Sequence, residues 1–223
     1  EIYQCDWSSD VCSSDLKNTG ISMKKLVACL MIGLGWMSFA YAGGDADAGQ
    51  GKAAVCGGCH GADGNSLIAS FPKLAGQGEL YLVKQMMDIR EGARDVPQMA
   101  GLLTSLNDQD LADIAAYYAA QTSSIGATDP AMVDLGRQLY RAGNAAKDVA
   151  ACTACHSPTG AGNAQAAFPA LSGQHADYII AQLNAFRTET RTNDKAKIMR
   201  QVAALMSDKE IAAVASYIQG LSN

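Results

Sequence analysis

The chain has 223 residues, of which 48% are hydrophobic and 17% charged, and its formal net charge at pH 7 is −5. This apolar content excludes an intrinsically disordered chain, and the length allows one or two domains. The acidic balance argues against nucleic acid as a partner.

The first segment, residues 1–22, precedes the first methionine and contains a near-repeat, 7–11 followed by 12–16. The sequence Cys-Ser-Ser-Asp-Leu at 12–16 can be encoded by the end of a common sequencing adapter. We therefore interpret 1–22 as a non-native translated artefact and expect initiation at Met23. A peptide from 1–22 in the native precursor would contradict this interpretation.

Residues 23–42 have the pattern of a signal peptide. Two lysines follow Met23, an apolar run covers 26–39, and Ala-Tyr-Ala at 40–42 forms a small-x-small cleavage site. The run is short for a bilayer span, although an uncleaved anchor is the alternative. The mature chain is expected to be exported and to begin near Gly43.

Two later segments share the pattern Cys-x-x-Cys-His, at 56–60 and at 152–156. This pattern is the attachment motif for haem c, in which the two thiols add across the haem vinyl groups as thioethers. The following histidine places an imidazole nitrogen on the iron. The predicted attachment residues are Cys56, Cys59, Cys152 and Cys155, and the predicted proximal ligands are His60 and His156. The sequence thus predicts two covalently bound haem c groups.

Other kinds of site also use paired cysteines. One four-cysteine zinc site would not explain a histidine after each pair, and nearly a hundred residues separate the pairs. Redox-active dithiols are expected in a strand–helix pattern, which neither segment shows. Structural disulfides are a third alternative for an exported protein. Two copies of the full motif behind a signal peptide favour haem.

The chain from residue 43 onward is a tandem repeat. The motif Phe-Pro-x-Leu-x-Gly-Gln occurs at 71–77 and again at 168–174, and Tyr81 and Gln85 return 97 positions later. The two copies meet near 123–130, a small polar stretch with turn-forming glycine and proline. The predicted domains are 43–125 and 126–223.

Both copies show the hydrophobic spacing of α-helices and almost no strand signal. The predicted helices lie at 48–55, 77–91 and 108–120 in the first copy and at 132–142, 174–187 and 208–220 in the second. Asn107 or Asp108, and Ser207, are expected to cap the last helix of each copy. Aromatic residues make up only 6% of the chain, so each core needs a large apolar cofactor. The expected fold class is all-α, with two tandem domains related by the internal repeat.

An electron-transfer haem needs a second axial ligand, and the repeat selects a methionine. Met99 and Met199 correspond to each other at an offset of 100, whereas Met86 and Met206 align with other residue types. Met86 and Met206 are therefore expected to fill the core. Met99 and Met199 are predicted to lie in loops before the last helix of each copy and to be the distal iron ligands.

For several polar or loop residues the sequence indicates a role less specifically. His175 aligns with a glycine and is expected to start a helix or to lie beside a haem propionate, not to bind iron. The carbonyls of Pro72 and Pro169 are expected to accept a hydrogen bond from the proximal histidines, with plain turn prolines as the alternative. A further set is predicted to contact the propionates or the interface between the copies, with core packing or a solvated helix face as the alternative: Tyr81, Tyr178, Gln77, Gln174, Arg90 and Arg187.

The two haem motifs, the repeated Phe-Pro segments and the paired methionines resemble the di-haem cytochrome c4 family over essentially all of 43–223. The segments 191–194 and 198–200 are also similar to that family. The resemblance implies that each copy is a class I cytochrome c domain and that the two haems lie close together. It also implies an electron carrier of the bacterial periplasm, which in some members associates loosely with the membrane. The segment between Arg94 and Met99 is short, so we expect an altered loop over the first haem.

The expected function is outer-sphere electron transfer without catalysis, because histidine and methionine together leave no open position on the iron. The expected partners are redox proteins, namely a donor such as a quinol-oxidising complex and an acceptor such as a terminal oxidase. Residues 43–127 carry a net charge of −5 and residues 128–223 a net charge of +1. This asymmetry is expected to orient the molecule between donor and acceptor.

Three other roles would keep the haems. The chain could be the dedicated cytochrome subunit of a dehydrogenase, such as a flavin-containing sulfide-oxidising enzyme, and isolation as a free monomer would exclude this role. A haem enzyme or gas sensor requires that one methionine does not bind iron. Di-haem peroxidases fit less well, because they are larger and keep a vacant site.

Overall fold

The computed structural model describes residues 43–222. The segments interpreted as a translated artefact (1–22) and as a signal peptide (23–42) lie outside the described residues. Within the described range the structure is helical, as expected, and its extended backbone pairs only in two isolated bridges, at Asn144–Val149 and Asn163–Phe168. None of the helices described is both long enough and apolar enough to cross a bilayer.

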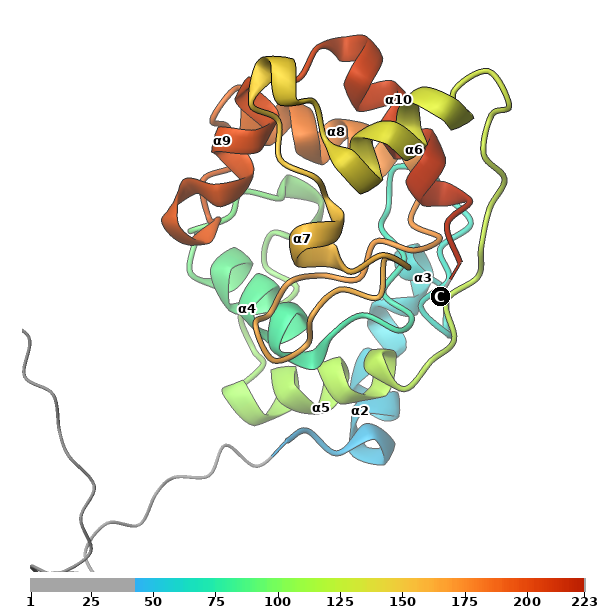
Figure 1. The fold of residues 1–223 in the computed structure, drawn as a ribbon. Helices are drawn as coiled ribbons and strands as arrows, with labels where there is room; N and C mark the ends of the chain where they lie inside the picture. The colour runs from blue at the N-terminus through green and yellow to red at the C-terminus, as the bar shows by residue number, and fades with distance from the viewer. Residues whose placement is uncertain (1–42, 223) are drawn as a thin grey trace, which may run out of the picture. The chain divides into compact units, whose positions relative to one another are not determined.

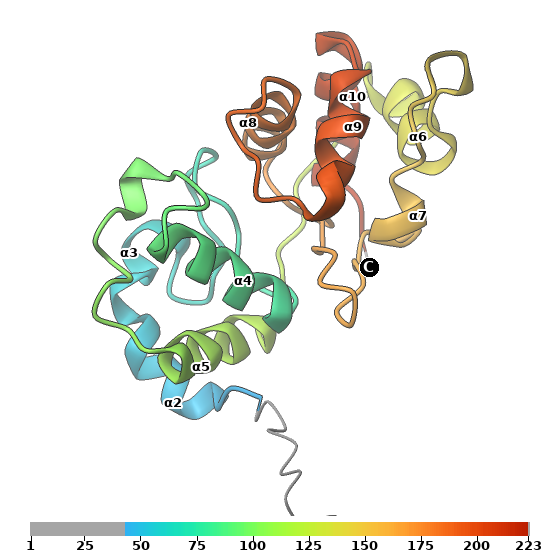
Figure 2. The same cartoon turned by 90° about the vertical axis from the view of Figure 1, so that its left-hand side faces the viewer.

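The helices form two groups, which Figure 2 shows as separate clusters. The first group consists of α2 (Ala46–Lys52), the turn η1 (Ala53–Val55), α3 (Gly57–His60), α4 (Glu79–Arg90), the turn η2 (Pro97–Met99) and α5 (Asp108–Ala119). The second group consists of α6 (Val133–Ala142), the turn η3 (Ala145–Lys147), α7 (Thr153–His156), α8 (Ala176–Arg187), the turn η4 (Lys195–Lys197), α9 (Ile198–Ala204) and α10 (Asp208–Gln219). Figure 1 colours the first group blue to green and the second yellow to red.

All six predicted helices are confirmed, and the ends of five of them lie within two residues of those expected. The sixth, α2, begins two residues earlier and ends three residues earlier than expected, and the turn η1 covers the remaining predicted positions. The short helices α3 and α7 and the helix α9 were not predicted. The helices α3 and α7 span four residues each, which is too short to show a hydrophobic period.

The last helix of each group begins at a capping box, in which the cap and the third helical residue exchange hydrogen bonds. The Asn107 side chain accepts from the Asp110 N–H at 2.9 Å, and the Asp110 carboxylate accepts from the Asn107 N–H at 3.0 Å. Ser207 and Glu210 repeat this arrangement at the start of α10. Two of the predicted caps, Asn107 and Ser207, are thereby confirmed.

The first and last helices of each group cross in close contact. A Cβ atom added at Gly49 of α2 would lie 1.9 Å from the Asp113 carbonyl of α5, and one at Gly136 of α6 would lie 2.3 Å from the Ala213 carbonyl of α10. Glycine is therefore required at both crossings. Each group then encloses a core of its own, which contains Leu111 and Ile114 in the first group and Ile211, Val214 and Ile218 in the second.

Two glutamines join the groups through paired hydrogen bonds to backbone. Gln77 accepts from the Ala170 N–H at 2.7 Å and donates to the Ala170 carbonyl at 3.0 Å. Gln174 accepts from the Lys73 N–H and donates to the Lys73 carbonyl, both at 2.9 Å. The Lys73 amine also donates to the Ser124 carbonyl and to the carbonyl of Gly173, which precedes Gln174. The sequence placed both glutamines at this interface or at the propionates, and the structure places them at the interface.

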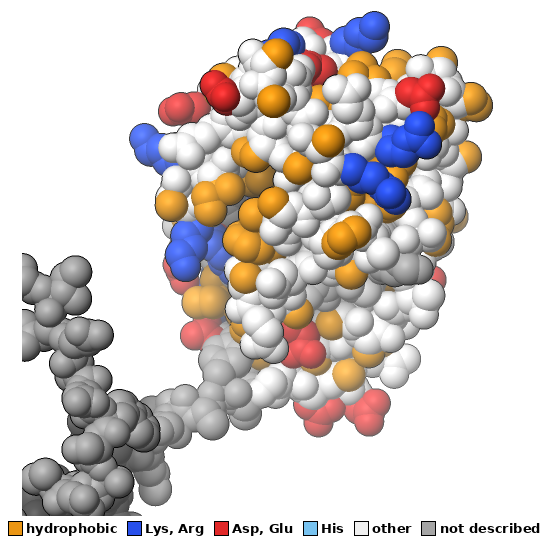
Figure 3. All heavy atoms as spheres, viewed as in Figure 1, with side chains coloured by type: hydrophobic (Ala, Val, Ile, Leu, Met, Phe, Trp, Pro, Cys, Tyr) orange, Lys and Arg blue, Asp and Glu red, His pale blue; other side chains and the backbone are white. Residues whose placement is uncertain are grey.

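Charge is distributed unequally over the surface. On the face drawn in Figure 3, acidic side chains lie both at the end formed by α2 and α5 and over the second group, whereas most of the basic side chains lie over the second group. This distribution agrees with the net charges of −5 for residues 43–127 and +1 for residues 128–223.

Candidate functional site

Each Cys-x-x-Cys-His segment folds into a single helical turn. The His60 N–H donates to the Cys56 carbonyl at 3.0 Å, and the His156 N–H donates to the Cys152 carbonyl at 2.9 Å. Residues four apart in a helix lie on one face, so the turn directs the first cysteine and the histidine to the same side.

The four cysteines of these segments are free in the structure. Burial raises the pKa of the Cys56 thiol, and it raises the pKa of the Cys152 thiol to about 11. No group of three or more His, Cys, Asp or Glu side chains within residues 43–222 could hold a metal ion by itself. Within residues 43–222 the four cysteines are unpaired, so two thiols per segment are available for thioether formation.

Both proximal histidines are held in one orientation by a backbone carbonyl. His60 Nδ1 lies 2.9 Å from the Pro72 carbonyl oxygen, and His156 Nδ1 lies 2.9 Å from that of Pro169. These hydrogen bonds confirm the role expected for the two prolines. A carbonyl can only accept, so Nδ1 carries the proton and the lone pair of Nε2 is free to bind a metal.

The environment of these histidines keeps the imidazoles neutral. Both side chains are buried, and burial lowers the pKa of His60 and of His156. The rings of Phe71 and Phe168 lie 6.3 and 6.4 Å from the respective imidazole centroids. A neutral imidazole with one fixed tautomer is the form that ligates iron.

The loop after each motif is anchored by a single carbonyl oxygen. The Gly64 carbonyl accepts from the Leu74 and Ala75 N–H groups at 2.7 and 3.2 Å. The Gly160 carbonyl accepts from the Leu171 and Ser172 N–H groups at the same two distances. These bonds fix the segment just after each proline, and with it the carbonyl that orients the histidine.

The structure brings each candidate methionine to the same apolar cluster as the first cysteine of its group. Met99 and Cys56 pack against the first core, and Met199 and Cys152 pack against the second. Met99 ends the turn η2 in the connection between α4 and α5, as expected.

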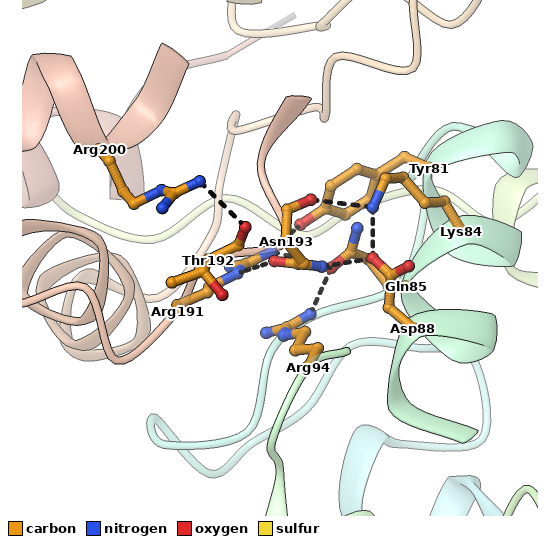
Figure 4. A network of polar contacts seen from close by, with 9 residues as sticks. All are labelled: Tyr81, Lys84, Gln85, Asp88, Arg94, Arg191, Thr192, Asn193 and Arg200. Atoms are coloured by element: carbon orange, nitrogen blue, oxygen red, sulfur yellow. Dashed lines mark hydrogen bonds and ion pairs between the residues drawn. The ribbon is translucent and has the colours of Figure 1, made fainter. Parts of the chain in front are cut away.

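Met199 does not lie in a loop, which corrects the prediction, because it is the second residue of α9. Met199, Val202 and Ala203 are spaced at helical positions i, i+3 and i+4 and face the second core. The connection before the last helix is three residues longer in this group, which leaves room for the helix. Arg200 stabilises the connection by donating to the Thr192 carbonyl at 3.2 Å (Figure 4).

The other methionines and His175 lie where the sequence predicted. Met86 and Met206 are buried in the two cores, which confirms them as core residues. His175 is the N-terminal cap residue of α8, and its Nε2 atom lies 2.8 Å from the Ser66 carbonyl oxygen. His175 therefore starts a helix, as expected.

The repeated tyrosines and arginines separate into two sets. Tyr81 and Tyr178 lie at the interface between the groups, where each accepts a hydrogen bond from an arginine of the other group. Arg90 and Arg187 instead pair with Asp108 and Asp208 at the start of the last helix of their own group. The two arginines therefore hold the start of the last helix within their own group, and their contact with the propionates stays a prediction.

The sequence reasoning missed the two arginines that contact these tyrosines, Arg94 and Arg191. They are related by the same offset of 97 positions as the tyrosines, so the repeat could have identified them. Their side chains converge at the centre of the network in Figure 4.

Exposed apolar side chains flank the candidate ligands. Val55 precedes Cys56 and is 63% exposed, and Leu102 follows Met99 closely and is 49% exposed. Apolar surface beside neutral imidazole, thiol and thioether donors fits a large apolar macrocycle that binds iron. The donor set and its surroundings thus fit a haem in each group.

Comparison with known proteins agrees with this geometry. A family model for cytochrome c matches residues 46–120 and again residues 133–222. A cytochrome c4 of Pseudomonas aeruginosa is 60% identical over 200 residues, which covers 89% of this chain and all of the relative. A thiosulfate dehydrogenase electron acceptor of Stutzerimonas stutzeri is 41% identical over 170 residues, which covers 74% of this chain and 78% of the relative.

A solved structure shows the same architecture. The crystal structure of reduced recombinant cytochrome c4 from Pseudomonas stutzeri matches with a TM-score of 0.78 and 54% sequence identity, and the match covers 80% of this chain and 99% of that one. The two matches of the family model coincide with the two groups of helices. The chain therefore belongs to the di-haem cytochrome c4 family, as an electron-carrier cytochrome with two tandem cytochrome c domains and two covalently bound haem c groups.

Proposed function

We propose that this chain is a periplasmic carrier of single electrons between a respiratory donor, such as a quinol-oxidising complex, and a terminal oxidase, and that it catalyses no bond chemistry. The observation that supports the proposal is the presence of two equivalent sites, each with a buried neutral imidazole tied to a proline carbonyl. We further propose that the mature chain begins near Gly43, with domains at 43–125 and 126–223.

The proposed ligand set has two equivalent halves. In the first domain Cys56 and Cys59 would form the thioethers, and His60 and Met99 would bind the haem iron. In the second domain the corresponding residues are Cys152, Cys155, His156 and Met199. Occupation of both axial positions would leave no site for a substrate, which supports a carrier and not an enzyme.

The protein's own groups set the conditions for electron transfer. The haem, when bound, supplies reversible one-electron chemistry. The carbonyls of Pro72 and Pro169 hold each imidazole in one tautomer and one orientation, so that the ligand needs little movement between redox states. A methionine thioether is a neutral ligand that raises the potential.

Spectroscopy of the holoprotein tests the ligand set. A methionine-to-iron charge-transfer band in the far red should integrate to two per molecule in the oxidised protein. Met99→Ala should remove half of this band, and Met86→Ala, a change at a buried core methionine, should retain all of it. A full band in Met99→Ala, or a single haem per molecule, would contradict the proposal.

A second candidate function is the dedicated cytochrome subunit of a dehydrogenase. The 41% identity to a thiosulfate dehydrogenase electron acceptor favours this role. Purification from native cells separates the two candidates, because a free carrier elutes as a monomer, whereas a subunit elutes with its dehydrogenase and retains that activity.

A further inference from the structure

The loops that carry Met99 and Met199 begin at equivalent arginines, Arg94 and Arg191. Each arginine N–H donates to a carbonyl in the last turn of the preceding helix of its own domain, at 2.9 and 3.0 Å. The backbone of each loop is therefore anchored within its own domain at the arginine, whose side chain extends across the interface.

The Arg94 guanidinium reaches helix α8 of the second domain. It donates to the Tyr178 hydroxyl at 3.0 Å and to the Gln182 side-chain oxygen at 3.1 Å. Its other terminal nitrogen donates to Gln85 of its own domain at 2.9 Å. The start of the first methionine loop is therefore held in part by the second domain.

The Arg191 guanidinium makes the reciprocal contacts with helix α4 of the first domain. It donates to the Tyr81 hydroxyl at 3.3 Å and to the Gln85 side-chain oxygen at 2.9 Å. It also donates to Gln182 of its own domain at 2.7 Å. The two arginines and two glutamines thus form a closed ring of hydrogen bonds, with a tyrosine beside each arginine.

Among the side chains of residues 43–222, the ring of hydrogen bonds contains two guanidinium groups and two amides. Arg191 and Gln85 are buried, and neither Arg94 nor Arg191 forms an ion pair with any residue in the described range 43–222. The hydrogen bonds described for each guanidinium go to amide and hydroxyl oxygens, and Arg191 also lies over the Phe186 ring, 4.5 Å from its centroid. Hydrogen bonds from a charged donor are stronger than neutral ones, so the loss of one tyrosine hydroxyl removes a substantial part of the anchoring.

The second loop has additional contacts with the first domain. Asn193 donates to Gln85 at 2.9 Å and to the Asp88 carboxylate at 2.6 Å. Lys84 donates to the Asn193 carbonyl at 2.9 Å, and it also pairs with Asp88 (Figure 4). Among the contacts described, Arg94 is the only residue of the first loop that bonds to the other domain. The first loop therefore depends more on Tyr178 than the second loop depends on Tyr81.

We propose that Tyr178 and Tyr81 are positioning residues, each of which holds the methionine loop of the opposite domain through that loop's arginine. Only five chain positions separate Arg94 from Met99, so a displacement of the arginine is transmitted to the methionine. The distal side of each haem is thereby set in part by the other domain. The effect on the haem rests on the proposed ligation by Met99 and Met199, whereas the anchoring itself does not.

Amide hydrogen exchange of the holoprotein tests the anchoring. Met99 and Leu102 have hydrogen-bonded N–H groups, which report opening of the first loop. Tyr178→Phe, which removes one hydroxyl from the second domain, should accelerate exchange at these amides about tenfold and leave α9 unchanged. Tyr81→Phe should accelerate exchange in α9, to a smaller extent, and leave the first loop unchanged.

The control variant is Tyr217→Phe, which removes a hydroxyl that accepts from Arg141 within the second domain at 3.3 Å. Tyr217→Phe should leave amide exchange in both methionine loops unchanged. Acceleration in the loop of the mutated domain, or no acceleration in either loop, would overturn the proposal.

Two further measurements separate the anchoring from the ligation. Proton NMR of the oxidised protein should show two shifted methionine methyl signals, and Met99→Ala assigns the signal of the first domain. In Tyr178→Phe that signal should be lost at a lower temperature, and only the potential of the first haem should shift. Absence of both signals from the unaltered protein would refute the ligation alone, because exchange still tests the anchoring. If Tyr178→Phe accelerates amide exchange in the first loop but changes neither the methionine signals nor the haem potentials, the anchoring does not affect the haem and that part of the proposal is refuted.

Discussion

At the scale of single residues, each core contains one buried tyrosine, but the tyrosine comes from a different helix in each domain. Tyr118 lies on α5 and packs 5.2 Å from Tyr117, and Tyr140 lies on α6 and packs 5.6 Å from Tyr217. The Tyr140 hydroxyl donates to the Ser157 carbonyl at 2.8 Å. The Tyr118 hydroxyl is buried without a partner among residues 43–222.

Phenylalanine substitutions at these two tyrosines should have different effects on stability. Tyr140→Phe is expected to lower the free energy of unfolding by about 1 kcal/mol, because it removes a satisfied hydrogen bond. Tyr118→Phe is expected to be neutral or to raise it by up to about 1 kcal/mol, because it removes an unsatisfied buried hydroxyl. Urea unfolding of the holoproteins, followed by circular dichroism, measures both. A marked loss of stability in Tyr118→Phe would mean that the bound haem supplies a partner for this hydroxyl.

Gly64 is a second position at which one residue determines the local structure. Its φ is +79°, and an added Cβ would lie 2.7 Å from the Ala75 nitrogen. Gly64→Ala should therefore destabilise the first domain by about 3 kcal/mol. Gly92 has the same φ of +79° but open space around it, so Gly92→Ala should cost only about 1 kcal/mol. Equal losses for the two variants, measured by urea unfolding, would show that the close approach is unimportant.

At the scale of elements, a buried carboxylate secures the last helix of each domain. Lys52 of α2 pairs with Asp113 of α5, and Lys147 of η3 pairs with Glu210 of α10. Asp113 also accepts from the Asp45 N–H at 2.9 Å, next to the start of α2. These contacts join segments that are more than sixty positions apart in the chain.

The pH dependence of stability should reflect these two carboxylates. Hydrogen bonds from Lys52 and from Lys147 lower the pKa of Asp113 and of Glu210, each to about 2, below the value of about 4 in an unfolded chain. Because the folded-state pKa is depressed, the stabilisation is fully present above about pH 4 and is lost as the pH falls towards 2. Urea unfolding at a series of pH values should show this loss. Asp113→Asn and Glu210→Gln should each make the decline shallower, and an unchanged decline would contradict the assignment.

At the scale of the whole molecule, paired glutamine bonds join the two domains. Gln174→Leu would leave the Lys73 N–H and carbonyl buried without partners, at about 1–3 kcal/mol each. We therefore expect a decrease of at least about 2 kcal/mol in the free energy of unfolding. Gln219 also bonds both a backbone N–H and a carbonyl, but it is only half-buried, so Gln219→Leu should cost less. If Gln219→Leu lowered the free energy of unfolding more than Gln174→Leu does, the interface bonds of Gln174 would not be the more important ones.

Unequal charge on the two domains should also have a kinetic effect. Long-range attraction raises the rate of encounter between charged proteins, and added salt screens it. We therefore expect the second-order rate constant for electron transfer to a physiological oxidase to depend on ionic strength. A constant rate from low to high salt would refute an orienting role for the charges.

The chain itself determined the two haem motifs, the repeat, six helices and two caps. These features depend on residues close together in sequence, because thioether attachment, helical periodicity and capping act over a few positions. The role of the proline carbonyls could also be predicted, because Pro72 and Pro169 occupy matching places in the two copies.

Only the tertiary structure decided how the two domains contact each other. Gln85 and Arg191 are 106 positions apart, and nothing local in the sequence pairs a guanidinium with an amide across an interface. The tertiary structure also placed Met199 in a helix, because the longer connection in the second domain allows a turn of helix that packs against the core. Residues close together in sequence thus specified what each domain binds. Contacts between residues far apart in sequence specified which residues of one domain hold the other.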